Sequence, residues 1–305
     1  MNPLLPKPLL DGELLRAFVA FAEEEHVTRA ALRVGLSQPA LSERLTRLSE
    51  LAGVQLVARE GRKLTLTPEG RVMEAFARDA LRSADTLQRA LRGEEEAGRV
   101  TLTAGEGTYL YLLNAPLRAL ARQDVELSLR VEGASAAMES VAVGRADLGV
   151  VAADALPHAL ESIPLLVTKL VLLMPETHAL ATKRTLKLAA LQSETLILPP
   201  EGRTHRTFIL RAMGQRGITP RAVRDADGWP LMVAFASMGL GLAVVNEMVV
   251  RERLPEGLVA RPLAELGTLT YQLVRRRGRV LPKAAEELSS LIVHSMRAKM
   301  PRLRP

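Results

Sequence analysis

The sequence lacks cysteine altogether, and aromatic residues make up only 3% of its 305 residues. A chain without cysteine forms no disulfide, offers no thiolate to zinc or to an iron–sulfur cluster, and contains neither a thiol nucleophile nor a thiol redox sensor. This composition fits a protein of the reducing cytoplasm, which is the location that we expect. Leucine, valine and alanine must build the core, because few aromatic side chains are present.

Long apolar runs are also missing. No segment reaches the roughly 18 consecutive apolar residues that a membrane helix needs. Residues 1–15 do not show the basic segment followed by an apolar run that marks a secretory signal. We therefore expect no membrane partner.

The motifs of common enzymes are absent as well. The sequence contains no GxSxG, Walker A, HExxH or strand-following GxGxxG motif. Its five histidines are scattered and, without cysteine, give no metal-ligand spacing. We expect a protein that is not an enzyme, has no catalytic residue and holds neither a metal ion nor a cofactor.

The length and the charge distribution are more informative. At ~150 residues per domain, 305 residues predict about two domains. The net charge is +7, yet residues 1–98 contain 14 Lys and Arg against 15 Asp and Glu. Within them, residues 28–71 contain 8 cations against 4 acids. This local basic region, rather than the whole-chain charge, indicates nucleic acid as a partner.

The N-terminal region is predicted to form a helix-turn-helix. Residues 13–25 place apolar side chains at helical spacing. Thr28 is interpreted as the N-cap of a short second helix, which Gly35 ends in the left-handed conformation. Ser37 then caps a third helix, QPALSERLTRLSELA. Two helices joined by a short turn that contains glycine are typical of this motif.

The third helix has two faces. Its leucines Leu41, Leu45 and Leu48 form one stripe that should be buried, so the opposite face is left for the major groove. Residues 56–67 then alternate as two strands around a basic turn, which predicts a wing that contacts phosphates or the minor groove. The residues expected to contact DNA are Thr28, Ser37, Gln38, Pro39, Ser42, Glu43, Thr46, Arg47, Arg62 and Lys63.

A long helix is predicted from Pro68, capped by Thr67. Its apolar positions repeat every three or four residues, which predicts a seam that pairs with the same helix of a second chain. The alternative is that the seam packs against the first helix of its own chain. The seam consists of Met73, Phe76, Ala80, Ala84, Leu87 and Leu91.

These N-terminal segments resemble the DNA-binding domain of LysR-type transcriptional regulators. The most specific pieces are SQPALS, LTRLSE and LTPEG, within a match over residues 11–92. The resemblance implies double-stranded DNA, a homodimer or homotetramer, a small-molecule effector and RNA polymerase as partners. Glu43 departs from the family, which often has a cation or an amide there. A carboxylate at this position repels phosphate but accepts a hydrogen bond from cytosine N4.

The remainder of the chain alternates strands and helices, which predicts a parallel α/β sheet. By resemblance it forms a two-subdomain α/β effector domain like a periplasmic binding protein. The expected fold class is therefore α/β with an N-terminal winged helix-turn-helix. The predicted parts are the winged helix-turn-helix at 1–67, the dimerisation helix and hinge at 68–98, subdomain one at 99–162 with 268–297, and subdomain two at 163–267.

Loops that follow strands are the expected effector site, because ligands of open α/β sheets bind beyond the carboxyl ends of the strands. Two of the chosen residues lie near helix N-termini and Arg203 adds a cation, which favours an anionic or carboxylate effector. Trp229 is the expected wall. The candidate effector-binding residues are Thr108, Tyr109, Ser135, Arg203, Thr204, His205 and Trp229.

Two functions compete at this stage. The first is a ligand-responsive DNA-binding transcriptional regulator, in which effector binding between the subdomains alters the arrangement of the DNA-binding heads. The alternative is a cytoplasmic solute-binding protein or an α/β enzyme with an accessory helical domain. A basic run, residues 275–279, is interpreted as a solvated strand end, with a second DNA contact as the alternative.

Overall fold

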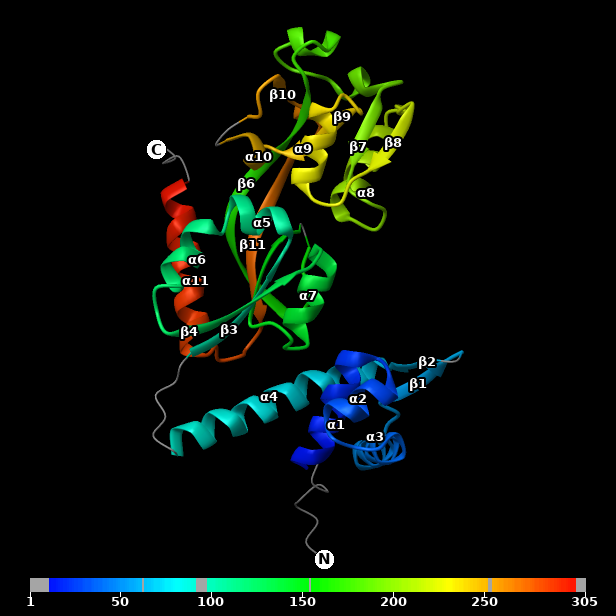
Figure 1. Ribbon diagram of the computed structural model, residues 1–305, viewed down its shortest axis with the longest axis vertical. Coiled ribbons are helices and arrows are strands. Elements are labelled where there is room, and N and C mark those ends of the chain that lie inside the picture. The colour runs from blue at the N-terminus through cyan, green and yellow to red at the C-terminus, as the bar shows by residue number, and fades with distance from the viewer. Residues whose placement is uncertain (1–10, 62, 92–97, 154, 252–253, 300–305) are drawn as a thin grey trace, which may run out of the picture. The chain divides into compact units, whose positions relative to one another are not determined.

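The computed structural model describes residues 11–61, 63–91, 98–153, 155–251 and 254–299. These residues form two compact units (Figure 1). The first, which we call the head, contains four helices and a hairpin. The second, which we call the effector domain, begins at residue 98.

The head starts with three short helices, α1 (Gly12–Glu24), α2 (Val27–Arg33) and α3 (Gln38–Ala52). Gly35 has a φ of +68°, which confirms the predicted left-handed turn after α2. The Ser37 hydroxyl accepts a hydrogen bond from the Ala40 amide at 3.3 Å, which confirms it as the N-cap of α3. The prediction for Thr28 was wrong: the N-cap of α2 is His26, two residues earlier, so Thr28 lies inside the first turn.

The core of the head is the apolar face shared by its helices. Leu41, Leu45 and Leu48 are all buried, as the spacing predicted, and they pack with Phe18 and Phe21 of α1. At roughly 2 kcal/mol for each buried leucine or phenylalanine side chain, this cluster fixes α3 on α1 and turns the opposite face of α3 outward.

The wing is a two-stranded antiparallel hairpin, β1 (Val57–Glu60) and β2 (Lys63–Leu66). Its register pairs Glu60 with Lys63, and Gly61 has a φ of +64°, which a tight hairpin turn requires. Arg62, the other predicted wing cation, lies outside the described residues.

Helix α4 (Pro68–Leu91) follows the hairpin. The Thr67 hydroxyl accepts a hydrogen bond from the Gly70 amide at 2.9 Å, so the predicted cap is confirmed. The first half of α4 packs into the core of the head through Met73 and Ala77. Leu87 and Leu91, in its second half, are 59% and 78% exposed within a single chain. Packing within the chain therefore describes the first half of the helix, and pairing of the seam with a second chain stays a prediction.

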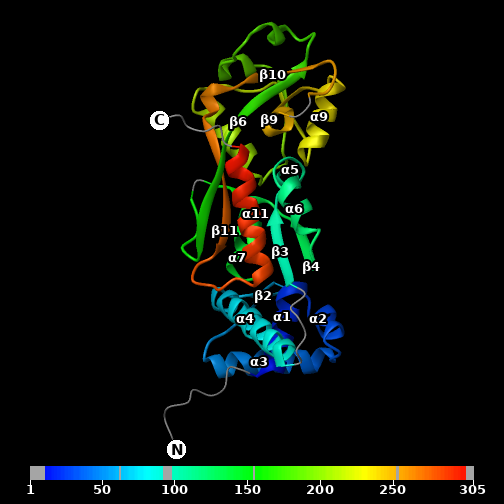
Figure 2. The same cartoon turned by 90° about the vertical axis from the view of Figure 1, so that its left-hand side faces the viewer.

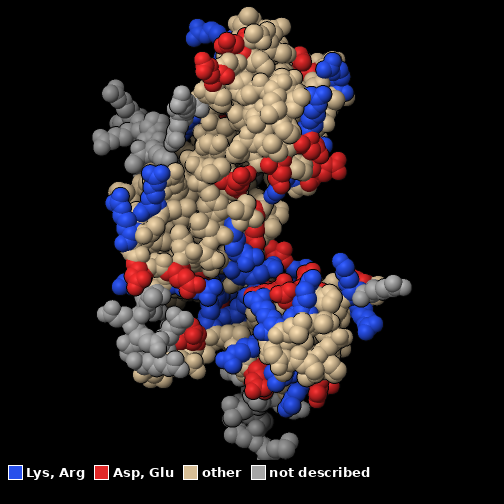
Figure 3. Space-filling view, viewed as in Figure 1, with Lys and Arg blue, Asp and Glu red and all other residues tan. Residues whose placement is uncertain are grey.

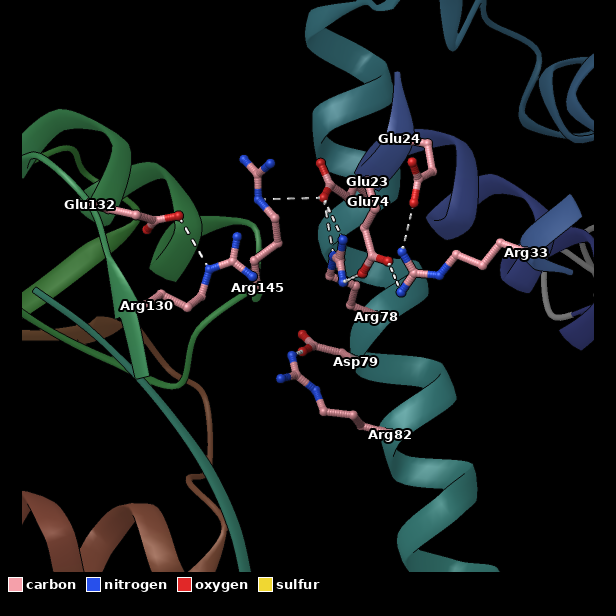
Figure 4. Close-up of polar contacts among 10 residues, drawn as sticks. All are labelled: Glu23, Glu24, Arg33, Glu74, Arg78, Asp79, Arg82, Arg130, Glu132 and Arg145. Carbon is pink, nitrogen blue, oxygen red and sulfur yellow. Dashed lines mark hydrogen bonds and ion pairs between the residues drawn. The ribbon is translucent and has the colours of Figure 1, made fainter. Parts of the chain in front are cut away.

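A charged network ties α4 to α1 and α2 (Figure 4). Glu23 accepts from Arg33 at 2.5 Å and from Arg78 at 2.7 Å, and Arg78 also contacts the buried Glu74 at 3.0 Å. A buried carboxylate is costly without such a partner. The network therefore holds the first half of α4 against α1 and α2, in addition to the apolar contacts.

The effector domain is built on one nine-stranded sheet, in the order β4-β3-β5-β11-β6-β9-β7-β8 with β10 paired to β6. The strands are β3 (Gly98–Ala104), β4 (Val125–Val131), β5 (Leu148–Ala152), β6 (Leu160–Pro175), β7 (Thr195–Leu198), β8 (Ala222–Asp225), β9 (Leu242–Asn246), β10 (Leu258–Pro262) and β11 (Thr268–Arg276). The expected parallel sheet is in fact mixed. The triplets β4-β3-β5 and β8-β7-β9 are parallel, whereas β6, β10 and β11 make antiparallel pairs.

The mixed pairing follows from β6 and β11, the two strands that connect the halves of the sheet. The first half contains β3, β4 and β5, and the second half contains β7, β8 and β9. β6 pairs with β11 over its first part and with β9 and β10 over its second part. β11 returns to the first half and lies between β5 and β6. A register shift interrupts this pairing between Tyr271 and Gln272, which is typical of a bend in a strand.

Helices cover both halves of the sheet. α11 packs against α6 and β3 (Figure 2). Two short helices, α5 and α6, follow β3. The helices are α5 (Glu106–Tyr111), α6 (Asn114–Leu120), α7 (Ala134–Ala142), α8 (Thr204–Gly214), α9 (Trp229–Ser237), α10 (Met248–Arg251) and α11 (Lys283–Lys299), with 3-10 turns at Ala179–Thr182, Leu188–Leu191 and Ala264–Leu266.

Candidate functional site

The outward face of α3 is the first candidate site. Pro39, Ser42, Glu43, Thr46 and Arg47 are all exposed on it. Their side chains project from early and middle turns of a helix held from behind by buried leucines. This is the position from which a recognition helix presents side chains to base edges and phosphates.

Several hydroxyls on this face already have partners. The Thr28 hydroxyl donates to the Gln38 side-chain oxygen at 3.2 Å, which links the start of α2 to the start of α3. The Thr46 hydroxyl donates to the Ser42 carbonyl at 3.0 Å. The structure thus brings the predicted residues of α3 onto one face, whereas Thr28 belongs to α2 and Lys63 to the separate hairpin.

Pairing within the head reduces the number of cations available to DNA. Arg29 contacts Glu24 at 3.3 Å, and Arg44 contacts Glu13 at 2.9 Å. Figure 3 accordingly shows both signs of charge side by side on the visible face of the head. Counting the residues in the sequence missed these pairs, because the acids come from α1, outside the counted segment.

The second candidate site is a cavity of about 420 Å³ in the effector domain. It lies at the carboxyl ends of strands β3, β4, β5, β7 and β8, and Tyr271 of β11 also lines it. These ends come from both halves of the sheet. A concave site at strand ends, with polar groups among apolar walls, is the usual place for a small molecule in an α/β protein.

Five of the seven predicted effector residues line this cavity, namely Thr108, Arg203, Thr204, His205 and Trp229. Tyr109 and Ser135 are not among the lining residues. Tyr109 turns inward instead: its hydroxyl lies 2.7 Å from the Leu102 carbonyl and 2.9 Å from that of Arg130, and burial raises its pKa. It therefore joins β3 to β4. Ser135 is exposed in the first turn of α7.

Three carboxylates in the cavity escaped the sequence analysis: Glu106, Glu132 and Asp227. Both oxygens of Asp227 accept from Arg203, at 2.9 and 2.8 Å. Glu132 accepts from the Thr103 hydroxyl at 2.7 Å and from Arg130 at 3.2 Å (Figure 4). Arg203 and Glu132 are thus each paired with an opposite charge, and Glu106 is the lining acid for which the described residues give no ion pair. Each acid lies within two residues of a strand end, a signal that could have identified it.

Glycines allow the two halves to approach closely around the cavity. A Cβ at Gly107 would overlap the ring of Trp229, and one at Gly228 would overlap the carboxylate of Glu106. A Cβ at Gly133 would lie 2.9 Å from an Arg203 nitrogen. In each case the glycine belongs to one half and the side chain to the other. The absence of a side chain at these three positions permits the closed arrangement seen here.

His205 and Trp229 form the aromatic side of the cavity, with ring centroids 6.1 Å apart. The His205 Nε2 is closed to solvent and has no hydrogen-bond partner among the described residues. Burial lowers the pKa of His205 from 6.5 to about 4, so its imidazole is neutral at physiological pH. His205 lines the cavity, and its neutral Nε2 is an acceptor that the described residues leave unused.

The basic run at the end of β11, residues 275–279, is used within the effector domain. Arg275 contacts Glu161 at 2.7 Å, Arg277 donates to the carbonyls of His158 and Leu160, and Arg279 contacts the buried Asp147 at 2.9 Å. These bonds favour a structural role over a second DNA contact.

Within the described ranges, we find no group of three or more acidic or histidine side chains suited to a metal ion. No described helix is long and apolar enough to cross a membrane.

Comparison with known proteins places both parts of the chain. Residues 13–71 match the model described as "Bacterial regulatory helix-turn-helix protein, lysR family", and residues 93–297 match the "LysR substrate binding domain". The regulator XapR of Escherichia coli is 29% identical over 287 residues, covering 92% of this chain and 97% of XapR. A probable hydrogen peroxide-inducible genes activator of Streptomyces viridosporus is 30% identical over 301 residues, covering 93% of both chains.

The fold agrees with these matches. A full-length OxyR variant from Pseudomonas aeruginosa superposes with a TM-score of 0.70 at 22% identity, covering 98% of this chain and 99% of that one. The helix-turn-helix and the substrate-binding domain together set aside the enzyme and the solute-binding alternative. Regulators of this kind bind DNA and act as oligomers. The chain therefore belongs to the LysR family of bacterial regulatory helix-turn-helix proteins and is a transcriptional regulator.

Proposed function

We propose that the cavity of the effector domain binds a small-molecule effector, and that this binding changes how the DNA-binding heads of an oligomer are arranged on DNA. The carrying observation is the cavity itself: it joins strand ends from both halves and is lined by His205, whose Nε2 has no partner among the described residues. A ligand bound between the halves stabilises the closed form by its differential affinity for that form. If the ligand changes the affinity for DNA by some factor, DNA then changes the affinity for the ligand by the same factor.

In this proposal the exposed face of α3 reads bases and the wing contacts the DNA backbone or the minor groove. The exposed Leu87 and Leu91 support assembly through α4 into a homodimer or homotetramer, because such leucines gain stability from a partner helix. The regulator would act in the cytoplasm and contact RNA polymerase at its promoters. No cofactor is required for this function.

A thiol-based peroxide response is not part of the proposal, although one relative is named for hydrogen peroxide. The sequence contains no cysteine, so neither a sulfenic acid nor a disulfide can form. The effector must therefore act by non-covalent binding or by chemistry that needs no thiol.

The test begins with genome-wide mapping of the DNA that the full-length protein binds. A fluorescent duplex carrying a mapped site is then titrated with protein, with and without metabolites of the neighbouring genes. We expect at least one metabolite to change both the operator affinity and the fluorescence of Trp229, the single tryptophan of the chain. If a metabolite changes operator affinity but not the tryptophan signal, and Trp229→Phe leaves the response intact, the effector binds elsewhere.

A further inference from the structure

The charges around the cavity are unequal. Among the lining residues that the structure describes, Glu106, Glu132 and Asp227 are acidic and Arg203 is the single Lys or Arg. Because one Arg203 nitrogen donates to both oxygens of Asp227, those two charges offset each other. Glu132 is likewise paired with Arg130, at 3.2 Å, so Glu106 remains as the lining acid without an ion pair among the described residues. Figure 3 shows acidic side chains over α8 and beside α5 on the visible face.

Helix N-termini at the cavity favour anions, but carboxylates of this chain already lie beside two of them. α7, α8 and α9 all begin at the cavity, and each N-terminus is equivalent to about half a positive charge, screened by solvent. Glu132 and Asp227 precede two of these helices and offset their dipoles locally. A ligand anion would therefore compete with carboxylates that already occupy the favourable positions, whereas a ligand cation would find acceptors.

Glu106 is well placed to meet such a cation. It begins α5 in one half of the domain, and its carboxylate lies against Gly228, the residue before α9 in the other half. Its strand, β3, is the parallel neighbour of β4, whose end is followed by Glu132. The two carboxylates thus project from adjacent strand ends into the same cavity.

His205 supplies an independent indication that a ligand group belongs here. Its Nε2 is closed to solvent and lacks a partner among the described residues, although it belongs to a cavity-lining side chain. A buried polar atom without a partner is unfavourable by roughly 1 to 3 kcal/mol, a cost that a ligand donor removes. A neutral imidazole with its proton on Nδ1 accepts at Nε2.

We propose that the effector is a small organic cation with an amine or amidine group. In this arrangement the cationic group donates to Glu106, Glu132 and the His205 Nε2, and the remainder of the ligand packs on Trp229 and on the apolar residues Val150 and Met232. An ammonium group has three donors, which equals the number of these acceptors. The indole face of Trp229 adds a cation–π attraction. The inference rests on the proposed function of this cavity as the effector site.

The test compares matched amines, alcohols and carboxylates on the same carbon skeletons, from butyl to phenylpropyl. Each is titrated into the full-length protein, and Trp229 fluorescence reports binding. We expect the amines to bind tightest. Glu106→Gln and Glu132→Gln should each weaken amine binding about tenfold to hundredfold, the loss expected for a hydrogen bond to a charged group. The matched control is Glu126→Gln, an exposed acid on β4 outside the cavity, which should leave amine affinity unchanged.

Several results would overturn the inference. They are tighter binding of the carboxylates or alcohols, unchanged amine affinity in the Glu106→Gln, Glu132→Gln double variant, and no binding by any amine of the panel. The operator titration separates the two proposals. A neutral or acidic metabolite that alters operator binding through Trp229 would refute the cationic effector but keep the effector site. If amines bind at Trp229 and operator affinity never changes with any ligand, the regulatory proposal fails instead.

Discussion

The face of α3 and the cavity of the effector domain are built in different ways. The proposed DNA-reading face belongs to one helix, and its residues lie between Pro39 and Arg47. The cavity takes its residues from five strand ends and β11, between Gly105 and Tyr271. A local site depends on helical periodicity, which the sequence displays directly. A site assembled over long sequence distances depends on strand order and on which side chains meet after folding. Each ion pair or hydrogen bond formed in this way changes the charge and the free polar groups that the site presents.

The largest effect is expected from a substitution in the second half of α4, which tests whether this helix also pairs with a second chain. Leu87→Glu should dissociate the oligomer, because pairing would bury an unpartnered charge at a cost of about 3 to 5 kcal/mol. Molecular mass measured by light scattering checks the result. Gln88→Glu, an exposed neighbour that lies outside the predicted seam, is the control and should keep the oligomer. A Leu87→Glu protein of unchanged mass would show that Leu87 does not lie in an interface.

The next test concerns the cavity. Gly107→Val places a side chain where the ring of Trp229 lies, which should disfavour the closed form by about 1 to 3 kcal/mol. Ligand affinity and the ligand response of operator binding should fall, while operator binding without ligand is preserved. Gly214→Ala is the control, because no atom lies within 4 Å of the added Cβ. If Gly107→Val keeps the wild-type ligand response, closure around Trp229 is not required.

The wing is expected to contribute affinity without sequence preference. Changing Arg62 and Lys63 together to alanine should weaken binding to every duplex and reduce the slope of log affinity against log salt by about 0.9 for each lost phosphate contact. Fluorescence anisotropy at several salt concentrations measures this slope. A slope equal to that of the wild type would remove the wing from the DNA interface.

Glu43 should have a smaller and more selective effect. Glu43→Gln removes a charge that repels phosphate, and we expect equal or higher affinity for unrelated DNA together with a changed preference at one base pair, by about 1 kcal/mol. Selection from a randomised duplex library measures the preference. Proportional changes at all sequences would contradict a base-reading role for Glu43.

The last expected effect is a pH dependence specific to the effector domain. The pKa of His205 is about 4 in the folded protein, below the ordinary 6.5, so the unfolded chain binds a proton first as the pH falls. The free energy of unfolding therefore decreases progressively as the pH falls from 6.5 toward 4. At pH 5 the loss due to His205 amounts to about 1 to 2 kcal/mol. Thermal unfolding of His205→Gln should show a weaker decline with acid. An identical decline in both proteins would mean that other groups determine it.

The sequence by itself determined the head almost completely. Ser37, Gly35 and the leucines of α3 act within a few residues, through capping, turn geometry and helical spacing, so their consequences are visible without a structure. Thr28 is the exception, because several residues near a helix start can serve as its N-cap. Composition alone also excluded thiol chemistry throughout the chain.

Only the tertiary structure decided the character of the cavity. The loops were predictable from strand ends, but the pairing of Arg203 with Asp227, the inward turn of Tyr109 and the approach of Glu106 to Gly228 depend on how distant strands pack. These contacts convert an expected anion site into one with an excess of carboxylates. The physical reason is that electrostatic character depends on which charges are already neutralised by neighbours, and those neighbours lie far away in sequence.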